Sequence, residues 1–145
     1  MAQRKGRASW EGNLFEGSGV VSALSSSLFT DAPVTWASRT EEPGGKTSPE
    51  ELIAAAHATC LSMALANGLA EEGHAPKRLE TDATVTLDQT GSGFAITAIH
   101  LTVRGEVDGV DDEAFREAAE QAKENCPVSK ALAAVGEITL DASLA

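Results

Sequence analysis

The side chains of this chain best suited to chemistry are the thiols of its two cysteines, Cys60 and Cys126. Cys60 lies within a long apolar stretch, and Cys126 lies at the junction of two segments with helical periodicity. A two-thiol redox enzyme uses this number, with one thiol to attack its substrate and a second to resolve the intermediate. The alternatives are an inert core residue at position 60 and a helix-end residue without a role at position 126. The sequence leaves open whether the sulfurs meet.

A reactive thiol needs a group that stabilises its thiolate, such as a cation or a helix N-terminus. Pro127 fits the first position of a helix, which would place Cys126 near amide donors. His57 precedes Cys60 by three residues on the same helix face and could hydrogen-bond to it, although a satisfied core histidine is the simpler interpretation. Arg39 is expected at the end of a strand and Glu50 at the second position of a helix. An ordinary surface arginine and a carboxylate that complements the helix dipole remain alternatives.

Other classes of site find little support in the sequence. The three histidines and two cysteines lack the spacing of zinc ligands. Neither a Gly-x-Gly-x-x-Gly motif nor a P-loop occurs. A Ser/His/Asp triad stays open, although no Gly-x-Ser-x-Gly elbow is present. We therefore expect neither a metal nor an organic cofactor.

Composition indicates a globular chain of one domain, residues 1–145, with 42% hydrophobic residues for a core. The net charge of −11 disfavours binding to nucleic acid or to an anionic membrane surface. The N-terminal segment lacks the apolar region of a secretory signal. Polar residues interrupt the longest apolar run, around 52–66, which we expect to be too short to span a bilayer. These features predict a cytoplasmic protein whose cysteines are reduced at rest.

The first third of the chain is predicted to form strands at 7–12, 19–25 and 34–39, followed by an exposed loop at 41–49. A helix is expected over 48–73. Ser48 is its N-cap, Pro49 its first residue, Glu51 completes a capping box, and Gly73 is the stop signal. Apolar residues cover nearly all faces of this helix, so we expect it to be buried.

The remaining pattern predicts two long antiparallel strands, 79–88 and 93–107, joined by a hairpin turn. Helices follow at 111–126 and after Pro127, and residues 137–144 close the chain as a strand. The order indicates an α+β fold with helices packed on antiparallel sheet. One chain can hardly cover every face of the 48–73 helix. We therefore expect an intertwined homodimer whose sheets wrap around the central helices of both subunits.

Three segments of the chain, SPEELIAAAHATCLSMALA, NCPVSKAL and EITLDASL, resemble the OsmC/Ohr peroxidases, and the likeness spans essentially the whole chain. His57, where the Ohr branch usually has tyrosine, favours the OsmC branch of osmotically inducible proteins. The resemblance implies an intertwined homodimer that reduces organic hydroperoxides, and hydrogen peroxide as well. It implies that Cys60 is the peroxidatic thiol, that Cys126 resolves it, and that Arg39 and Glu50 complete the site. It also implies a dithiol reductant of the lipoyl type.

Glu50 and Cys60 are ten residues apart, or ~15 Å along a continuous helix. If Glu50 is catalytic, antiparallel central helices would bring Glu50 of one subunit to Cys60 of the other. Two other functions remain open. One is a non-catalytic protein that binds a hydrophobic ligand, with Cys126 incidental. The other is a hot-dog-like thioesterase in which Glu50 activates water. Cys60→Ser should abolish the activity of a peroxidase, whereas it should leave ligand binding intact and barely affect a thioesterase.

Overall fold

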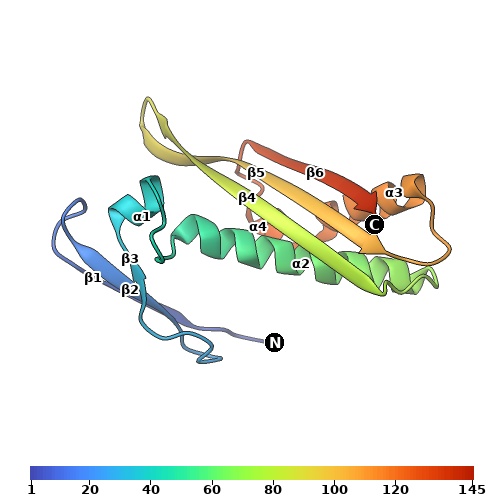
Figure 1. Cartoon of the computed structure of the whole chain (residues 1–145), viewed down its shortest axis with the longest axis horizontal. Coiled ribbons are helices and arrows are strands. Elements are labelled where there is room, and N and C mark those ends of the chain that lie inside the picture. The colour runs from blue at the N-terminus through green and yellow to red at the C-terminus, as the bar shows by residue number, and fades with distance from the viewer. The chain divides into compact units, whose positions relative to one another are not determined.

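The computed structural model describes residues 1–145, and the chain divides into two compact units, Met1–Leu52 and Ile53–Ala145. Figure 1 labels the elements of both units along the chain. Helix α2, Pro49–Glu71, begins in the first unit and continues without a break into the second. The expectation of a single domain over 1–145 stays a prediction.

The N-terminal unit contains an antiparallel sheet of β1 (Gly6–Glu11), β2 (Ser18–Ala23) and β3 (Ala32–Val34), in that order. The predicted first and second strands are confirmed. The third, expected over 34–39, is wrong beyond Val34, because Trp36–Thr40 forms the short helix α1.

A capping box at the start of α1 explains this difference. The Ser38 N–H donates to Thr35 Oγ1 at 3.1 Å, and the Thr35 N–H donates to Ser38 Oγ at 3.0 Å. The two short polar side chains satisfy the backbone donors of the first turn and favour a helix over a strand. Arg39 therefore lies in the last turn of α1 and not at the end of a strand.

Helix α2 begins as its sequence predicts. The Glu51 N–H donates to Ser48 Oγ at 3.2 Å, so Ser48 caps the first turn. The Glu51 carboxylate accepts a hydrogen bond from Thr47 Oγ1 at 2.5 Å and thereby ties the preceding loop to the helix. One of the two hydrogen bonds of the predicted capping box is therefore present. In place of the other, the Glu51 side chain contacts Thr47, one residue before the N-cap.

The C-terminal end of α2 is a Schellman motif built on Gly73. This glycine has φ = +84°, a left-handed conformation that favours glycine. The Gly73 N–H donates to the Ala70 carbonyl at 3.0 Å, and the His74 N–H donates to the Leu69 carbonyl at 2.8 Å. The helix turns therefore stop at Glu71, and Gly73 acts as the predicted stop signal.

By length and composition alone, α2 is apolar enough to cross a membrane, contrary to the expectation from its interrupted apolar run. The polar residues within it are too few to lower its hydropathy below that of a spanning helix. Core helices of soluble proteins pass the same test. A row of α2 residues four apart, His57, Leu61, Leu65 and Leu69, is fully buried in the C-terminal unit, as in such a core helix.

The C-terminal unit contains a second sheet, in the order β4 (Arg78–Thr90), β5 (Gly93–Glu106) and β6 (Glu137–Leu144). The predicted antiparallel hairpin of β4 and β5 is confirmed. The expectation of purely antiparallel sheet is wrong for β6, which pairs with β5 in parallel. Helices α3 (Asp112–Asn125) and α4 (Pro127–Ala131) form the crossover that returns the chain to the starting end of β5.

Helices α2 and α3 pack against one face of this sheet (Figure 1), and their contact forms the core. The buried core residues are Leu61, Leu65, Leu69, Ile99, Leu101, Val103, Phe115, Ala119 and Ala122. Gly105 on β5 allows the close approach of α3, because a Cβ atom there would lie 2.6 Å from the Phe115 ring. The predicted α+β fold is confirmed.

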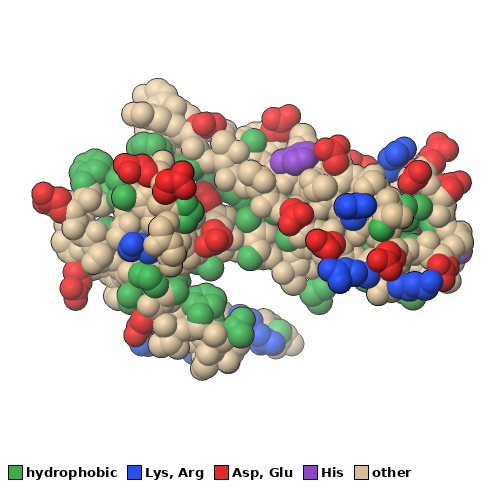
Figure 2. All heavy atoms as spheres, in the orientation of Figure 1, with side chains coloured by type: hydrophobic (Ala, Val, Ile, Leu, Met, Phe, Trp, Pro, Cys, Tyr) green, Lys and Arg blue, Asp and Glu red, His purple; other side chains and the backbone are tan.

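Parts of the α2 surface remain uncovered in the single chain. Met63 on this helix is 68% exposed, and several of its alanines are also exposed. Figure 2 shows hydrophobic side chains at the surface of the N-terminal unit as well as scattered acidic ones. The large exposed apolar residues of that unit's strands and loops include Trp10, Leu14, Phe15, Leu24 and Leu28. The complete burial expected for α2 is therefore not achieved by one chain alone.

Candidate active site

The fold brings the two cysteines together although they are far apart in the sequence. Cys60 lies in the middle of α2, and Cys126 lies where α3 ends and α4 begins. Both are free thiols, and their side chains lie close enough for each to shift the pKa of the other. Cys126 is completely buried, whereas Cys60 is half-buried. The arrangement places an accessible thiol beside an enclosed one.

The two thiols differ in their tendency to ionise. Burial raises the pKa of Cys60, and the hydrogen bond to Cys126 raises it further. Burial also acts to raise the pKa of Cys126, but the hydrogen bond from Cys60 and those from Ser129 and the Val128 N–H outweigh it, so this pKa is lowered. Of the two thiols, Cys126 therefore loses its proton more readily than Cys60.

Pro127 sets the backbone at Cys126, as the sequence predicts. Cys126 is at once the C-cap of α3 and the N-cap of α4, and its N–H donates to the Ala122 carbonyl at 2.8 Å. Its sulfur makes no capping hydrogen bond of standard geometry. The N–H groups of Ser129 and Val128 nevertheless lie near enough to the sulfur to lower the pKa of Cys126. The predicted amide environment of this thiol is therefore present.

His57 contacts a residue that the sequence interpretation missed. Its Nε2 atom lies 2.7 Å from Ser129 Oγ, and both side chains are buried. Its Nδ1 atom is buried without any hydrogen-bond partner. Burial lowers the pKa of His57, so its ring is neutral at neutral pH. The expectation of a satisfied core histidine is thus half right, and the suggested partner Cys60 is replaced by Ser129.

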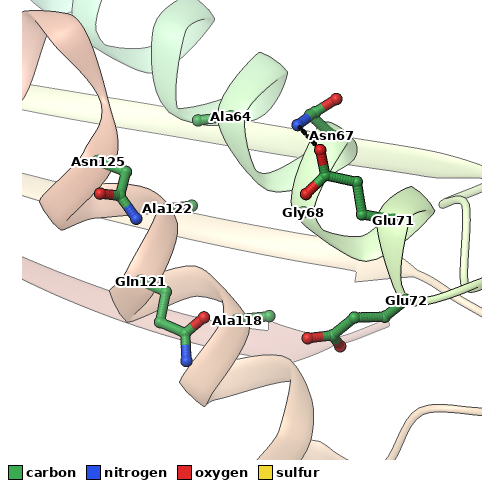
Figure 3. Close-up of a pocket in the computed structure, with 9 residues that line it drawn as sticks. All are labelled: Ala64, Asn67, Gly68, Glu71, Glu72, Ala118, Gln121, Ala122 and Asn125. Atoms are coloured by element: carbon green, nitrogen blue, oxygen red, sulfur yellow. Dashed lines mark hydrogen bonds between the residues drawn. The ribbon is translucent and has the colours of Figure 1, made fainter.

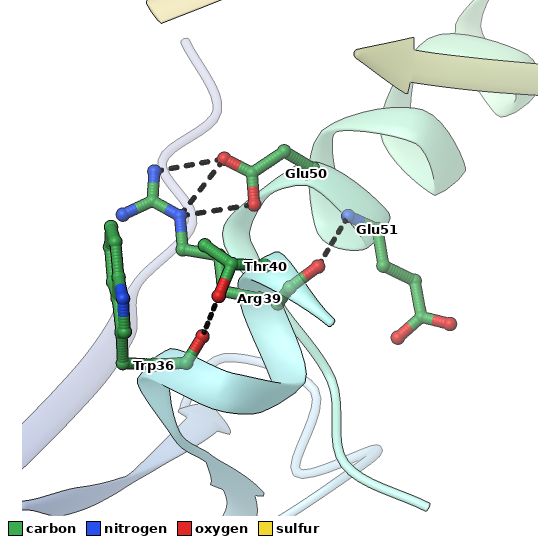
Figure 4. Close-up of polar contacts among 6 residues, drawn as sticks. Trp36, Arg39, Thr40, Glu50 and Glu51 are labelled. Atoms are coloured by element: carbon green, nitrogen blue, oxygen red, sulfur yellow. Dashed lines mark hydrogen bonds and ion pairs between the residues drawn. The ribbon is translucent and has the colours of Figure 1, made fainter. Parts of the chain in front are cut away.

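In the N-terminal unit, Arg39 and Glu50 form a bidentate ion pair (Figure 4). Arg39 Nη2 donates to Glu50 Oε1 at 2.8 Å, and Arg39 Nε lies 3.1 and 3.2 Å from the two carboxylate oxygens. The guanidinium also stacks over the Trp36 ring at 5.8 Å, and Trp36 contacts Phe15 edge to face. Glu50 is 7% exposed. Two neighbours therefore hold Arg39 in one orientation.

An apolar groove of about 430 Å³ lies beside Arg39. Two tryptophans contribute most of its aromatic surface, and a single cation borders it. Its lining consists of Trp10, Gly12, Leu14, Val34, Thr35, Trp36, Arg39 and Pro49. Such a groove can hold an apolar molecule whose polar end points toward a guanidinium.

A second cavity, of about 400 Å³, lies between α2 and α3 in the C-terminal unit (Figure 3). Its polar lining comes from Asn67, Glu71, Glu72, Gln121 and Asn125, and Figure 3 shows Ala64 and Ala122 on its walls. It contains neither thiol and no histidine or arginine. Its chemistry is that of a solvated surface hollow, so we do not assign it to the site.

The structure therefore forms two pairs from the four predicted site residues. Cys60 and Cys126 meet in the C-terminal unit, and Arg39 and Glu50 meet in the N-terminal unit. Glu50 and Cys60 lie on one continuous helix, which is the condition under which the two cannot share a site within one subunit. Sequence reasoning missed Ser129 and Trp36. For Ser129, the only hint in the sequence was its position in the first helical turn after Cys126.

Comparison with known proteins identifies the family. The family model described as OsmC-like protein matches residues 42–141, and the curated peroxiredoxin OsmC of Escherichia coli (strain K12) is 45% identical. This chain is an OsmC family protein. The OsmC match covers 97% of this chain and 96% of its relative. The family membership predicted from the cysteine motifs is confirmed.

Two further matches connect this OsmC family protein to the Ohr branch. Organic hydroperoxide resistance protein-like 2 of Staphylococcus epidermidis is 32% identical over 68% of each chain. The crystal structure of the organic hydroperoxide resistance protein OhrB of Bacillus subtilis superposes with a TM-score of 0.70 at 24% identity, over 97% of this chain and 98% of that one. The higher identity to the OsmC relative agrees with the predicted branch.

Proposed function

We propose that this protein is a thiol-dependent peroxidase that reduces organic hydroperoxides through Cys60 and Cys126. The observation that carries the proposal is the contact between two free thiols, one accessible and one enclosed. The names of its relatives, a peroxiredoxin and organic hydroperoxide resistance proteins, support the same chemistry.

Access decides the role of each thiol. A peroxide can reach half-buried Cys60 but not Cys126, which has no exposed surface. The Cys60 thiolate attacks the distal peroxide oxygen, the O–O bond breaks, and the alkoxide leaves and is protonated to an alcohol. Cys60 is thereby oxidised to a sulfenic acid. Hydrogen peroxide would react in the same way and release water.

The second step joins the two sulfurs. Cys126 attacks the sulfenic sulfur, an S–S bond forms, the S–O bond breaks, and the hydroxyl leaves as water. A dithiol donor then reduces the disulfide by exchange and becomes oxidised itself. We propose a lipoyl-type donor carried by a partner protein, on the basis of the family resemblance. Both thiols must be reduced at rest, which supports a cytoplasmic location.

Cys60 needs a cation to become a thiolate, because its surroundings raise its pKa and none of the groups that shift it is a cation. Arg39 is the best candidate, since Glu50 and Trp36 already orient its guanidinium. We propose that Arg39 and Glu50 of a second copy approach Cys60 in a homodimer. Glu50 is ~15 Å from Cys60 of its own chain along α2, so it cannot act there.

The uncovered apolar surface supports this homodimer. Met63 on α2 and the exposed aromatic and aliphatic residues of the N-terminal unit are left without cover in the single chain. Burial of apolar surface contributes about 25 cal/mol per Å², so a second copy of the chain is a favourable cover. The apolar groove beside Arg39 would then receive the organic tail of the peroxide.

The decisive experiment is a thiol count on folded, reduced protein before and after an equimolar amount of cumene hydroperoxide. We expect both thiols to disappear and peptide mass analysis to find a link between Cys60 and Cys126 within one chain. Survival of both thiols would contradict the proposal. A disulfide between chains would retain the peroxidase but reject the resolving role assigned to Cys126.

Replacement of Cys60 by Ser distinguishes the proposed function from its alternatives. It should abolish peroxide consumption because the attacking thiol is gone. A hydrophobic-ligand binder would keep its affinity in this variant, and a thioesterase that uses Glu50 would keep its rate. Cys126→Ser is the matched control, since it should retain one round of Cys60 oxidation and stop at the sulfenic acid.

A further inference from the structure

His57 interrupts an otherwise apolar row on the buried face of α2. Leu61, Leu65 and Leu69 follow it at intervals of four residues, and all four side chains are at most 1% exposed. A leucine at position 57 would extend this row into the core. The histidine instead leaves its Nδ1 atom buried without a partner, which destabilises the fold. A histidine at this position therefore suits a role other than packing.

The other nitrogen of His57 leads to the resolving cysteine through Ser129. His57 Nε2 lies 2.7 Å from Ser129 Oγ, which belongs to the first turn of α4 three residues after Cys126. The Ser129 side chain also lies near enough to the Cys126 sulfur to lower the pKa of that thiol. His57 and Cys126 are completely buried and Ser129 is 9% exposed. The three side chains therefore form one continuous chain of contacts inside the core.

The number of protons available decides which group donates and which accepts in each of these contacts. A serine hydroxyl has one proton, so Ser129 can donate either to the Cys126 sulfur or to His57 Nε2. When Cys126 is negatively charged, the hydroxyl donates to the sulfur, and its oxygen accepts from His57 Nε2–H. The neutral imidazole then has no proton on Nδ1, which is the atom that has no partner.

We propose that Ser129 is a catalytic hydrogen-bond donor to the Cys126 sulfur and that His57 is the positioning residue that orients its hydroxyl. This inference rests on the proposed two-cysteine cycle. In disulfide formation, Ser129 stabilises the Cys126 thiolate that attacks the Cys60 sulfenic acid. In reduction, the donor thiolate attacks the Cys60 sulfur, the S–S bond breaks, and Cys126 leaves with the electron pair as a thiolate again. The same hydrogen bond serves both steps.

The first test titrates Cys126 in reduced protein that carries Cys60→Ala, by the ultraviolet absorbance of the thiolate. Ser129→Ala and His57→Leu should each raise the pKa of Cys126. His57→Gln, whose amide N–H can replace Nε2–H, should restore it toward the parent value. Unchanged titration in both Ser129→Ala and His57→Leu would overturn the proposal. A purely structural role of His57 predicts no rescue by glutamine.

The second test follows a single turnover with both cysteines present. Ser129→Ala should slow disulfide formation by about tenfold relative to Cys60 oxidation, the effect of losing one hydrogen bond to a charged group. Ser129→Thr, which keeps the hydroxyl, should restore that rate. Equal slowing of both steps, or of neither, would reject the proposal.

The two tests also separate this inference from the proposed function. The titration needs no peroxide, so it decides the role of Ser129 and His57 even if the wild-type thiols do not react with one. Circular dichroism checks that each variant is folded. If Ser129→Ala does not fold, His57→Leu gives the answer, because leucine continues the apolar row of α2.

Discussion

Arg39 and Glu50 hold each other by three hydrogen bonds, with Arg39 Nη2 2.8 Å from Glu50 Oε1. The carboxylate is almost fully buried, whereas the Arg39 side chain is 32% exposed. Glu50 therefore fixes the guanidinium in one orientation while leaving part of it free for a further contact. A bidentate pair of this kind is both stronger and more directional than a single hydrogen bond.

Glu50→Gln should therefore weaken peroxide reduction without unfolding the protein. Glutamine is similar in size, but its amide nitrogen cannot accept a hydrogen bond as a carboxylate oxygen does and its charge is gone, so the guanidinium loses its fixed orientation. The loss of charge-assisted bonds predicts a decrease in kcat/KM for cumene hydroperoxide of roughly tenfold to a hundredfold. Steady-state kinetics measures it. Glu51→Gln is the control, because Glu51 contacts only the loop before α2, and it should keep the wild-type rate.

A site shared between two subunits predicts complementation between inactive variants. Cys60→Ser and Arg39→Ala chains should each be inactive alone. In a mixed dimer, Cys60 of the Arg39→Ala chain would meet the intact Arg39 of the other chain, so activity should return to at most about one half of wild type. The measurement is peroxide consumption after the two variants are unfolded and refolded together. Failure to regain activity, despite mixed dimers visible by native mass spectrometry, would place each site within one chain.

The buried imidazole predicts a pH-dependent stability. Burial lowers the pKa of His57 below its ordinary value of 6.5, so the unfolded chain binds the extra proton more readily. The stability present above pH 6.5 is therefore lost as the pH falls through the folded pKa, with a slope of at most about 1.4 kcal/mol per pH unit. Urea unfolding at several pH values between 7.5 and 5 measures this slope.

His57→Leu should flatten the pH dependence of stability, because no buried imidazole remains to be protonated. His74→Gln provides the control, since it removes a histidine that is only partly buried. A slope that persists in His57→Leu would assign the acid sensitivity to other groups.

The packing of Phe115 on Gly105 predicts that replacement by alanine has opposite effects on stability at Gly105 and at Gly68. Gly105→Ala would place a methyl group 2.6 Å from the Phe115 ring, which should destabilise the fold by about 1–3 kcal/mol. Gly68→Ala in α2 meets nothing within 4 Å and should stabilise the helix by roughly 0.5–1 kcal/mol. Thermal unfolding of both variants gives the comparison. Equal melting temperatures would show that α3 shifts to accommodate the methyl group.

Sequence patterns predicted those parts of the fold that are determined by residues close together in the chain. The Ser48 cap, the Gly73 stop and the β4–β5 hairpin all follow from residues within one or two turns of the chain. The wrong prediction at α1 also has a local cause. The alternating pattern over 34–39 predicted a strand, but the capping box of Thr35 and Ser38 favours a helix. A short segment can satisfy both patterns, and the capping bonds decide between them.

The partners within the site could not be predicted in this way. His57 and Ser129 are far apart in the sequence, and so are Cys60 and Cys126, and only the packing of α4 beside α2 brings them into contact. The parallel pairing of β6 likewise depends on the path of the α3–α4 crossover. The family resemblance supplied the roles of the cysteines, but neither it nor the pattern indicated the hydrogen bond that links Ser129 to His57.

Helix α2 buries one row of side chains in the C-terminal unit, whereas its Met63 side chain stays exposed in the single chain. If a second copy supplies that cover, dissociation and unfolding are linked by mass action. The melting temperature should then rise with protein concentration, and dilution alone should weaken the fold. Removal of the Met63 side chain would act on this concentration dependence more than on the core of either subunit. The amount of protein present would thus regulate how much of it is folded.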